Sequence, residues 1–587
     1  MTTAPTDSIL AADIGSVTTR AVMLDIVGGE FRFVGLGESR STVEAPFASL
    51  SEGLRHAIEN LSAATGRNFM DDHEQLIMPA KNDGTGVGAF AATASAGQPL
   101  RVALAGLMPN VSLASAERVA TTSYVKVVEV IGLGDRRRED QQLDSLLNTK
   151  PEVVILAGGT ERGSSSAVLR LAETVALAAA LLPEGERPVV LFVGNTAIRD
   201  KVSALFNGVC DVVNANNVRP DLDAEDTGPA ARQLARLYEQ LRLAQISGYG
   251  ELTQWHGGSL IPSANAFGSL IRFFSQTDSA KGALGIDLGS AATVVAAAAG
   301  DDLRLTVRSD IGVGHSAANV VHGVPIERMM RWLPEGFSED EVRDYCYNKS
   351  FNPAAIPHER RELMIEHALA RQCLQGAVNA ARQNWPPRAK TIRPGLLPAF
   401  QTLVATGAVL SRAPKPGQAA LMLLDGLQPT GWTTILLDQH GLASALGAAA
   451  AVNPIAAVQV IKTAGATLAT TVSLVGDARP GQTVARVKMA PIGGGDTVEI
   501  KVAYGSLQML RIPPDREAKV SIQPFNGFDA GFGSGVSQTV TIPASLAGLI
   551  VDARGRPLAL PKAPPKRLAA VTQWLNDVGE YGVVVSG

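Results

Sequence analysis

Two stretches of this sequence, residues 9–24 and residues 284–295, carry the same residue types in the same order. Each begins as an apolar run ending in Asp, continues through a tight turn with Gly and Ser, and passes one or two Thr into a second apolar run. A single turn of this kind is common in ordinary hairpins. Two copies far apart in one chain indicate an internal duplication, in which facing hairpins hold one nucleotide.

The two acidic residues, Asp13 and Asp287, are the candidates for catalysis and for metal binding. Mg²⁺ prefers oxygen ligands and keeps much of its water, so a carboxylate at the end of a buried strand suits it. We predict that Asp287 positions an attacking water through the metal and that Asp13 anchors a second metal-bound water. No clear general base is evident, and hydrolysis that relies on positioning and charge stabilisation is expected to be slow.

The residues after each Asp are suited to phosphate. Gly lets the turn bend and brings backbone N–H groups close to an anion, while Ser and Thr add hydroxyl donors. The predicted ligand is therefore a nucleotide, held through its phosphates together with Mg²⁺. The predicted nucleotide-binding residues of the two turns are Gly15, Ser16, Thr18, Thr19, Gly289, Ser290 and Thr293.

The elements that must position these turns alternate between strands and helices, which predicts an α/β fold. The chain of 587 residues is too long for a single core. We predict a first lobe over residues 1–150 and a second lobe over residues 248–463, each containing one hairpin. Within the first lobe, residues 81–99 are rich in Gly, Ala, Thr and Ser and are interpreted as a mobile loop or as a connection packed by small residues.

Residues 151–247 predict an inserted, Rossmann-like α/β unit. Its first strand, residues 153–157, is a continuous apolar run of the kind that is buried on both faces of a sheet. Gly turns after parallel strands collect at one edge, where ligands usually bind. The turn residues Gly158, Gly159, Thr160 and Asn195 therefore form either a ligand or partner face, or only tight strand-to-helix turns; the sequence leaves both open.

A later apolar strand, residues 403–406, ends at Gly407 and is followed by an Ala-rich helix over residues 443–450. In sugar kinases and actin-type ATPases, a strand of this kind carries glycines that contact adenosine, and an Ala/Gly-rich helix closes the lobe. Gly407 is accordingly a predicted nucleotide contact. Thr406 stands where members of that superfamily commonly have a second Gly.

The composition changes beyond about residue 464. Residues 464–560 alternate apolar and polar positions between Gly/Pro turns, which predicts a β barrel or sandwich. A Pro/Lys linker and a terminal helix are expected over residues 561–587. This β-rich domain is predicted to bind a partner or to complete a homo-oligomer.

Composition argues against several functions. The net charge of −4, without a basic stripe, argues against nucleic-acid binding. Apolar runs are too short to span a bilayer, and no basic and apolar signal precedes Asp13, so we expect a cytoplasmic protein with no membrane association. The three Cys residues are scattered, which argues against disulfides or a Cys-rich metal site. The isolated His315, His358 and His367 are interpreted as structural.

The chain resembles the glutamate mutase accessory family, the MutL/GlmL type, which is unrelated to the mismatch-repair protein of the same name. The resemblance covers about residues 9–460. It is carried, in the family's order, by residues 12–16, 153–160, 193–195, 285–293, 309–312 and 403–407.

The resemblance implies duplicated actin-like (ribonuclease H-like) ATPase lobes and association with subunits of an adenosylcobalamin-dependent mutase. The implied role is a reactivating chaperone that uses ATP to help exchange damaged cofactor. Two alternatives remain open at the level of the sequence. One is a filament-forming or structural actin-like ATPase, and the other is a small-molecule kinase, for which no convincing catalytic base is found.

Overall fold

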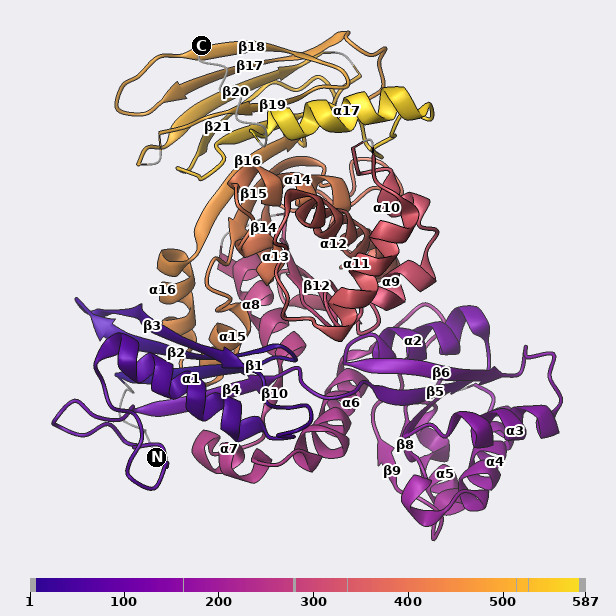
Figure 1. The fold of residues 1–587 in the computed structure, drawn as a ribbon. Helices are drawn as coiled ribbons and strands as arrows, with labels where there is room; N and C mark the ends of the chain where they lie inside the picture. Colours follow the sequence, from indigo (N-terminus) through magenta and orange to yellow (C-terminus); the bar gives the residue numbers. More distant parts are fainter. Residues whose placement is uncertain are drawn as a thin grey trace. The chain divides into compact units, whose positions relative to one another are not determined.

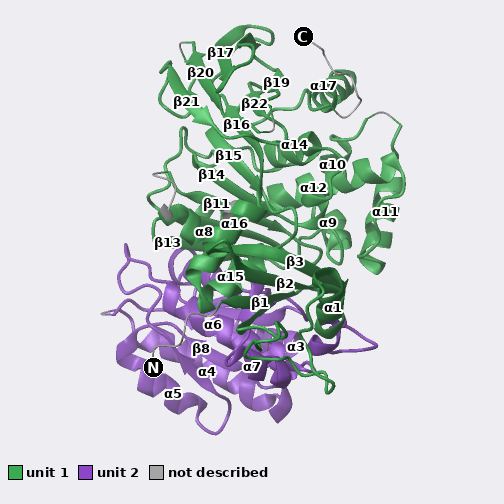
Figure 2. Ribbon diagram, turned by 90° about the vertical axis from the view of Figure 1, so that its left-hand side faces the viewer, with its two compact units in different colours: residues 1–40, 54–93, 265–587 green, residues 41–53, 94–264 purple. Residues whose placement is uncertain are grey.

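The computed structural model describes residues 7–161, 163–277, 281–334, 336–513, 515–525 and 527–579. The chain divides into two compact units, coloured separately in Figure 2. Unit 1 comprises Met1–Arg40, Leu54–Thr93 and Asn265–Gly587, and unit 2 comprises Ser41–Gly53 and Ala94–Ala264. Among the described residues, no helix is both long and apolar enough to cross a membrane.

The first sheet of unit 1 is built on an antiparallel meander. Its strands are β1 (Ser8–Ile14), β2 (Thr18–Val27) and β3 (Glu30–Arg40), with β4 (Ala89–Ala94) on the other side of β1. Helix α1 (Leu50–Thr65) lies so close to β3 that a side chain at Gly37 would overlap the Ala57 carbonyl oxygen. The sequence suggested a mobile loop or a packed connection for the segment 81–99. This segment contains β4, in which every residue after Ala89 is buried.

Two helices far along the chain complete this first sheet. Helix α15 (Ala443–Val452) packs on β1, and α16 (Pro454–Ala464) packs on β3 (Figure 1). The backbone N–H of Phe31 donates to the Gln459 Oε1 atom at 2.8 Å. Helix α15 also crosses α8 (Ser263–Thr277) closely, because a side chain at Gly447 would overlap the Ala266 backbone. The small residues predicted for the closing helix thus permit close helix packing.

The second sheet of unit 1 has eight strands in the order β13-β12-β11-β14-β15-β16-β22-β19. The first three form an antiparallel meander like that of the first sheet, and β14 and β15 then add parallel to β11. The bounds of these five strands are β11 Ala283–Leu288, β12 Thr293–Ala299, β13 Asp302–Arg308, β14 Thr402–Thr406 and β15 Gly431–Leu437.

One face of this sheet is covered by a buried helical layer. Its centre is α12 (Arg360–Ala381), whose side chains Ala368, Cys373 and Ala377 are fully buried. His367 lies in the same helix, where burial and then Arg371 lower its pKa to about 3 and keep the imidazole neutral. The other helices of the second lobe are α9 Ala317–Gly323, α10 Glu327–Met330, α11 Glu339–Phe351, α13 Ala408–Ser411 and α14 Pro416–Gly426.

The C-terminal region is not the separate domain that the sequence predicts from residue 464. Its strands β16 (Ala466–Ser473), β22 (Leu549–Asp552) and β19 (Leu507–Leu510) extend the eight-stranded sheet, because β16 pairs with β15. The remaining four strands form an antiparallel sheet in the order β18-β17-β20-β21. Its strands are β17 Thr483–Pro491, β18 Val498–Ala503, β20 Ala518–Pro524 and β21 Gln538–Ile542.

The terminal helix α17 (Pro564–Asp577) also belongs to the second lobe, since Val571, Trp574 and Leu575 join the core of that lobe. The sequence predicts only a linker and a helix over residues 561–587, and residues 580–587 lie outside the described residues.

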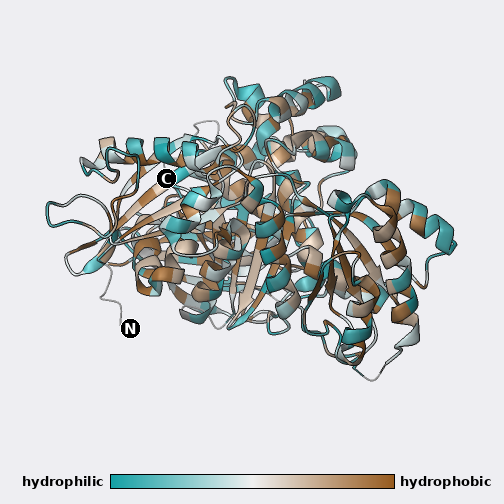
Figure 3. Cartoon of the chain, turned by 90° about the horizontal axis from the view of Figure 1, so that it is seen from below, coloured by the Kyte–Doolittle hydropathy of each residue, from teal (hydrophilic) through white to brown (hydrophobic). Residues whose placement is uncertain are grey.

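In the hydropathy colouring of Figure 3 the helices carry both apolar and polar residues, as expected of helices that cover a sheet on one side.

A buried ionic network fastens the C-terminal strands to this lobe. Asp552 is fully buried and binds Arg554 at 2.8 Å and Arg556 at 2.7 Å. Arg554 also reaches Asp425 of α14 at 2.7 Å, and Asp425 binds Arg371 of α12 at 2.7 Å. Burial alone would raise the pKa of Asp552, but the guanidinium groups of Arg554 and Arg556 hold it well below its usual value. The Asp552 carboxylate therefore stays ionised at neutral pH.

Unit 2 is a parallel α/β layer with strand order β6-β5-β7-β8-β9. The strands are β5 Leu100–Gly106, β6 Val125–Gly132, β7 Val153–Ala157, β8 Val189–Phe192 and β9 Val212–Asn214. The helices that accompany them are α2 Ala114–Ala120, α3 Glu139–Thr149, α4 Ser166–Leu181, α5 Arg199–Phe206, α6 Gly228–Leu241 and α7 Tyr249–His256.

This unit is larger than the inserted segment 151–247 that the sequence predicts. It begins near residue 94, because β5 and β6 hydrogen-bond in the same sheet as β7, and it continues to residue 264. The strands β5 and β6, which lie within the predicted first lobe over residues 1–150, therefore belong to unit 2. Continuous apolar runs identify buried strands, but the run alone does not tell which sheet a strand joins.

Candidate nucleotide site

The two predicted phosphate turns are Asp13-Ile14-Gly15-Ser16 and Asp287-Leu288-Gly289-Ser290, and we call them the Asp-Gly-Ser turns. They have the same backbone geometry. In the first, the N–H of Gly15 donates to the Thr18 carbonyl at 3.0 Å, and in the second the N–H of Gly289 donates to the Ala292 carbonyl at 3.0 Å. In each turn a side chain in place of Gly would press on the carbonyl oxygen three residues later. The similarity predicted from the sequence thus extends to the hydrogen bonding of the two hairpins.

A third acidic residue, Asp438, joins this site and was not predicted from the sequence. It follows β15 directly, is 3% exposed, and precedes the closing helix α15. Its carboxylate accepts the N–H groups of Leu442 at 2.9 Å and Ala443 at 2.8 Å, and the hydroxyl of Thr406 at 3.0 Å. An apolar strand ending in Asp before an Ala-rich helix is the signal that would have revealed it.

Thr406 has a defined structural role at the end of β14. Its hydroxyl donates to Asp438, and this hydrogen bond ties the end of β14 to the start of α15. Asp287 pairs with Thr406 in the parallel register of β11 and β14. Asp287 and Asp438 thus lie at the same end of β11 and β15, the two strands that flank β14.

The carboxylates of the site repel one another. Burial raises the pKa of Asp287 to about 7, and the charges of Asp13 and Asp438 add to the effect, while Arg20 opposes it. The Arg20 guanidinium is already paired with Glu38 at 2.8 Å, and Glu38 also binds Arg412 at 2.9 Å. A cation placed among these carboxylates would relieve the repulsion, so the residues fit the predicted Mg²⁺.

Within the described residues, no group of three His, Cys, Asp or Glu side chains is arranged to hold a metal ion by itself. Mg²⁺ usually keeps several waters and is bound by one or two carboxylates together with the phosphates of a substrate. Asp13 and Asp287 are the residues that would hold it.

Asp287→Asn is expected to stabilise the protein without ligand at pH 8. The folded state binds the Asp287 proton more tightly than the unfolded state, so stability falls as pH rises from about 4 to about 7, and the penalty persists above that range. Removing the charge should recover on the order of 2 kcal/mol at pH 8 and little near pH 4. Urea unfolding at both pH values measures this difference, and a less stable variant at pH 8 would contradict the repulsion.

The other predicted nucleotide-binding residues fall into two groups. Gly15, Ser16, Thr18, Gly289 and Ser290 all retain partial exposure at the turns.

By contrast, Thr19 is 1% exposed and Thr293 is 0% exposed. The Thr293 hydroxyl donates to the Ile311 carbonyl at 2.9 Å. Both side chains are enclosed by the fold at the start of the second strand of each hairpin, where Thr19 is the second residue of β2 and Thr293 the first residue of β12. Contact of these two residues with a nucleotide stays a prediction.

The second turn is wrapped by the segment 311–316. The N–H groups of Val313 and Gly314 donate to the carbonyls of Gly289 and Ser290, each at 3.0 Å. The Ser290 hydroxyl accepts the N–H of His315 at 3.0 Å and lies 3.1 Å from its Nδ1 atom. His315, interpreted from the sequence as structural, is therefore in direct contact with the predicted phosphate turn.

Gly407 is held in a conformation that other residues rarely adopt, with φ at +117°. An ideal Cβ at this position would overlap the carbonyl of Leu288, the residue after Asp287. The glycine thus lets the end of β14 pass the end of β11, which accounts for its residue type without any ligand.

Gly407→Ala is expected to cost about 2–4 kcal/mol, because backbone strain and the clash with Leu288 add together. The matched control is Gly257→Ala, since Gly257 has φ at +72° but open space around it. Thermal unfolding of both variants measures the difference. A similar loss in both would show that strain alone, and not the close approach, explains Gly407.

In unit 2 the glycines at the ends of β7 and β8 are also explained by packing. A side chain at Gly194 would overlap the Gly158 carbonyl, and one at Gly159 would press on the Ser164 carbonyl. Asn195 is 2% exposed, and its side chain accepts the N–H of Ala197 at 3.0 Å. These contacts favour the interpretation that the glycines and Asn195 form tight strand-to-helix turns, rather than the interpretation that they form a ligand or partner face. Thr160 directly follows Gly159.

The fold and the site together define a mixed α/β protein whose unit 1 repeats one Asp-Gly-Ser hairpin and gathers three carboxylates beside it. The chain belongs to the MutL protein family, whose model matches residues 9–464. The resemblance stated from the sequence is thereby confirmed. A relative described as Protein MutL from Clostridium tetanomorphum is 22% identical over 440 residues, which cover 70% of this chain and 88% of the relative.

Several solved structures show distant likeness. The diol dehydratase-reactivating factor in its nucleotide-free form is 11% identical, with a TM-score of 0.30 over 76% of this chain and 99% of the other. A glycerol dehydratase reactivase is 12% identical, with a TM-score of 0.30 over 76% and 100%. A nucleotide-free acetone carboxylase is 13% identical, with a TM-score of 0.34 over 84% and 81%. Likenesses at this level carry no argument about this chain.

Proposed function

We propose that the chain binds MgATP between the Asp13 and Asp287 hairpins and acts as an accessory, reactivating chaperone of an adenosylcobalamin-dependent mutase of the glutamate mutase type. The observation that supports nucleotide binding is that the two turns have the same backbone hydrogen bond. In addition, burial and the charges of Asp13 and Asp438 raise the pKa of Asp287 at the second turn. Membership of the MutL family supports the accessory role.

The same proposal includes the finer fold assignment, a duplicated actin-like ATPase. Its support is the antiparallel meander β1-β2-β3, which recurs as β11-β12-β13, with each meander placing its Asp at the same position. The parallel strands β14 and β15 then lead to Gly407 and to the closing helix α15.

Each residue of the site has a part in this proposal. Asp13 and Asp287 would hold the waters of the cation, and the Ser16 and Ser290 hydroxyls would donate hydrogen bonds to the phosphates from the two turns. Bound Mg²⁺ supplies neutralisation of the phosphate charge. Asp438 fixes the start of α15 through Leu442 and Ala443, and α15 contacts both β1 and α8.

The test is recovery of mutase turnover. Glutamate mutase carrying hydroxocobalamin in place of intact cofactor is mixed with adenosylcobalamin, the chain and MgATP, and turnover is followed. We expect recovery with the wild type and MgATP, and none with MgADP or with Asp287→Asn. Recovery that is equal without nucleotide, or no recovery by a wild type that binds MgATP, would refute the chaperone role and leave the nucleotide site standing.

A further inference from the structure

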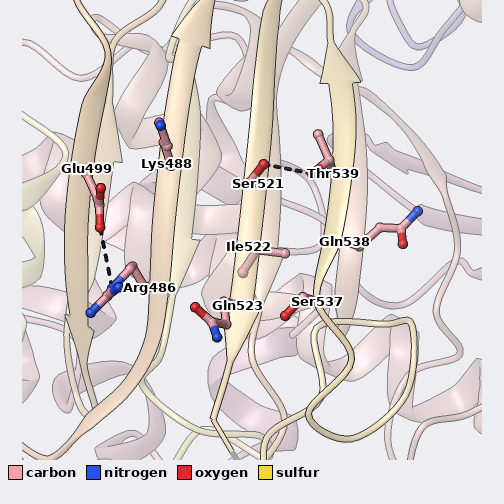
Figure 4. Close-up of a pocket in the computed structure, with 9 residues that line it drawn as sticks. All are labelled: Arg486, Lys488, Glu499, Ser521, Ile522, Gln523, Ser537, Gln538 and Thr539. Carbon is pink, nitrogen blue, oxygen red and sulfur yellow. Dashed lines mark hydrogen bonds and ion pairs between the residues drawn. The ribbon is translucent and has the colours of Figure 1, made fainter.

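The four-stranded sheet β18-β17-β20-β21 has two very different faces. Its inner face packs on an apolar core that includes Val487, Val502, Val520 and Ile522, all at most 1% exposed. Its outer face, shown in Figure 4, is polar. Because side chains alternate along a strand, every second residue of each strand contributes to this outer face.

The strand register concentrates positive charge on this outer face. Arg486 of β17 lies directly opposite Lys501 of β18, and directly opposed like charges destabilise an antiparallel pair. Lys488, two residues along, and Lys519 of β20 lie on the same face. The acidic residue of this face, Glu499, lies opposite Lys488 but pairs with Arg486 at 3.4 Å.

The four strands therefore place four cations and one anion on this face of a chain whose net charge is −4, and the exposed Glu517 directly precedes β20. Within the part of the chain that the structure describes, Lys488, Lys501 and Lys519 form no ion pair. Folding alone gives no reason to place Arg486 opposite Lys501, because the repulsion costs stability. An anionic partner would be attracted to both Arg486 and Lys501 and would offset the repulsion between them.

A hollow of about 310 Å³ lies on the same face, next to Arg486 and Lys488. It is lined by side chains that donate hydrogen bonds, chiefly Ser521, Gln523, Gln538 and Thr539. The hydroxyls of Ser521 and Thr539 lie 2.7 Å apart. Cations beside hydroxyl and amide groups are the surroundings that bind carboxylates through charge-assisted hydrogen bonds.

We propose that this outer face docks an acidic, carboxylate-bearing surface of a protein partner. A protein fits better than nucleic acid, because the labelled residues of Figure 4 include no aromatic ring on which bases stack. It fits better than a membrane, since the hollow is polar apart from the buried Ile522 and so offers no exposed apolar side chain to insert among lipids. The inference does not depend on the nucleotide site.

The experiment measures binding of the full chain to a fluorescein-labelled oligoglutamate peptide by fluorescence anisotropy at low and at physiological salt, without nucleotide. The test variant is the triple substitution Arg486→Gln, Lys488→Gln and Lys501→Gln. We expect wild type to bind with salt-dependent affinity and the triple variant to lose at least about tenfold. The urea midpoint confirms folding, and should rise slightly because the opposed cations are gone.

The matched control removes the same charge from exposed positions of unit 2, as Lys126→Gln, Lys201→Gln and Arg236→Gln. It should bind the peptide as wild type does. Duplex DNA and phosphatidylserine vesicles are tested in parallel. No binding of the peptide by wild type, an equal loss in the control, or tighter binding of DNA or vesicles than of the peptide would each overturn the proposal.

Discussion

Replacing Asp552 with Ala is expected to lower the free energy of unfolding by about 3–5 kcal/mol, because it leaves two guanidinium groups buried without their anion. Arg554 and Arg556 are both 0% exposed at their side chains. Arg554 keeps Asp425 as a partner, whereas among the described residues Arg556 keeps hydrogen bonds to Pro429, Gly555 and Ser473 but no carboxylate. Water cannot take the place of the lost carboxylate at this depth.

Urea unfolding measured at neutral pH tests this expectation. The matched control is Asp477→Ala, which removes a surface ion pair with Arg393 in which the Asp477 side chain is 79% exposed. Exposed pairs contribute about 0–1 kcal/mol, so the control should unfold close to wild type. If Asp552→Ala also stays within 1 kcal/mol of wild type, the C-terminal strands are not fastened to the second lobe by this network.

The predictions that the sequence supports best are local ones. The hairpins at Asp13 and Asp287 follow from apolar runs broken by Asp, Gly and Ser, and the Ala-rich helix predicted over residues 443–450 is found as α15. Such patterns depend on neighbours along the chain, so they can be interpreted without knowing the tertiary contacts. The order of strand, Gly407 and Ala-rich helix was predictable for the same reason.

The features that could not be predicted from the sequence depend on pairing between segments that are far apart in the chain. The strands β5 and β6 join the sheet of β7, and β16 joins that of β15, although nothing local to these runs specifies the partner. Asp438 was missed because its role depends on Thr406 and on the first amides of α15. The structural role of Gly407 likewise depends on Leu288, a residue far away in the sequence.

The central claim is that Asp13 and Asp287 together hold the metal of a bound MgATP. Both lie at the strand end that precedes an Asp-Gly-Ser turn, and their charges are coupled through the raised pKa of Asp287. Removing either carboxylate should weaken MgATP binding by at least about 10–100-fold, the range seen when groups that orient a metal's ligands are lost. Affinity should also rise as pH passes about 7, where Asp287 ionises.

The most direct measurement is calorimetric titration of MgATP into wild type, Asp13→Asn, Asp287→Asn and the control Asp72→Asn at pH 8. Asp72 is exposed and belongs to a loop outside the hairpins, so its loss changes the charge equally without touching the site. We predict that wild type and the control bind alike, that both site variants lose affinity, and that chelation of Mg²⁺ removes most of the difference. Wild-type affinity in both site variants would contradict the two-hairpin site.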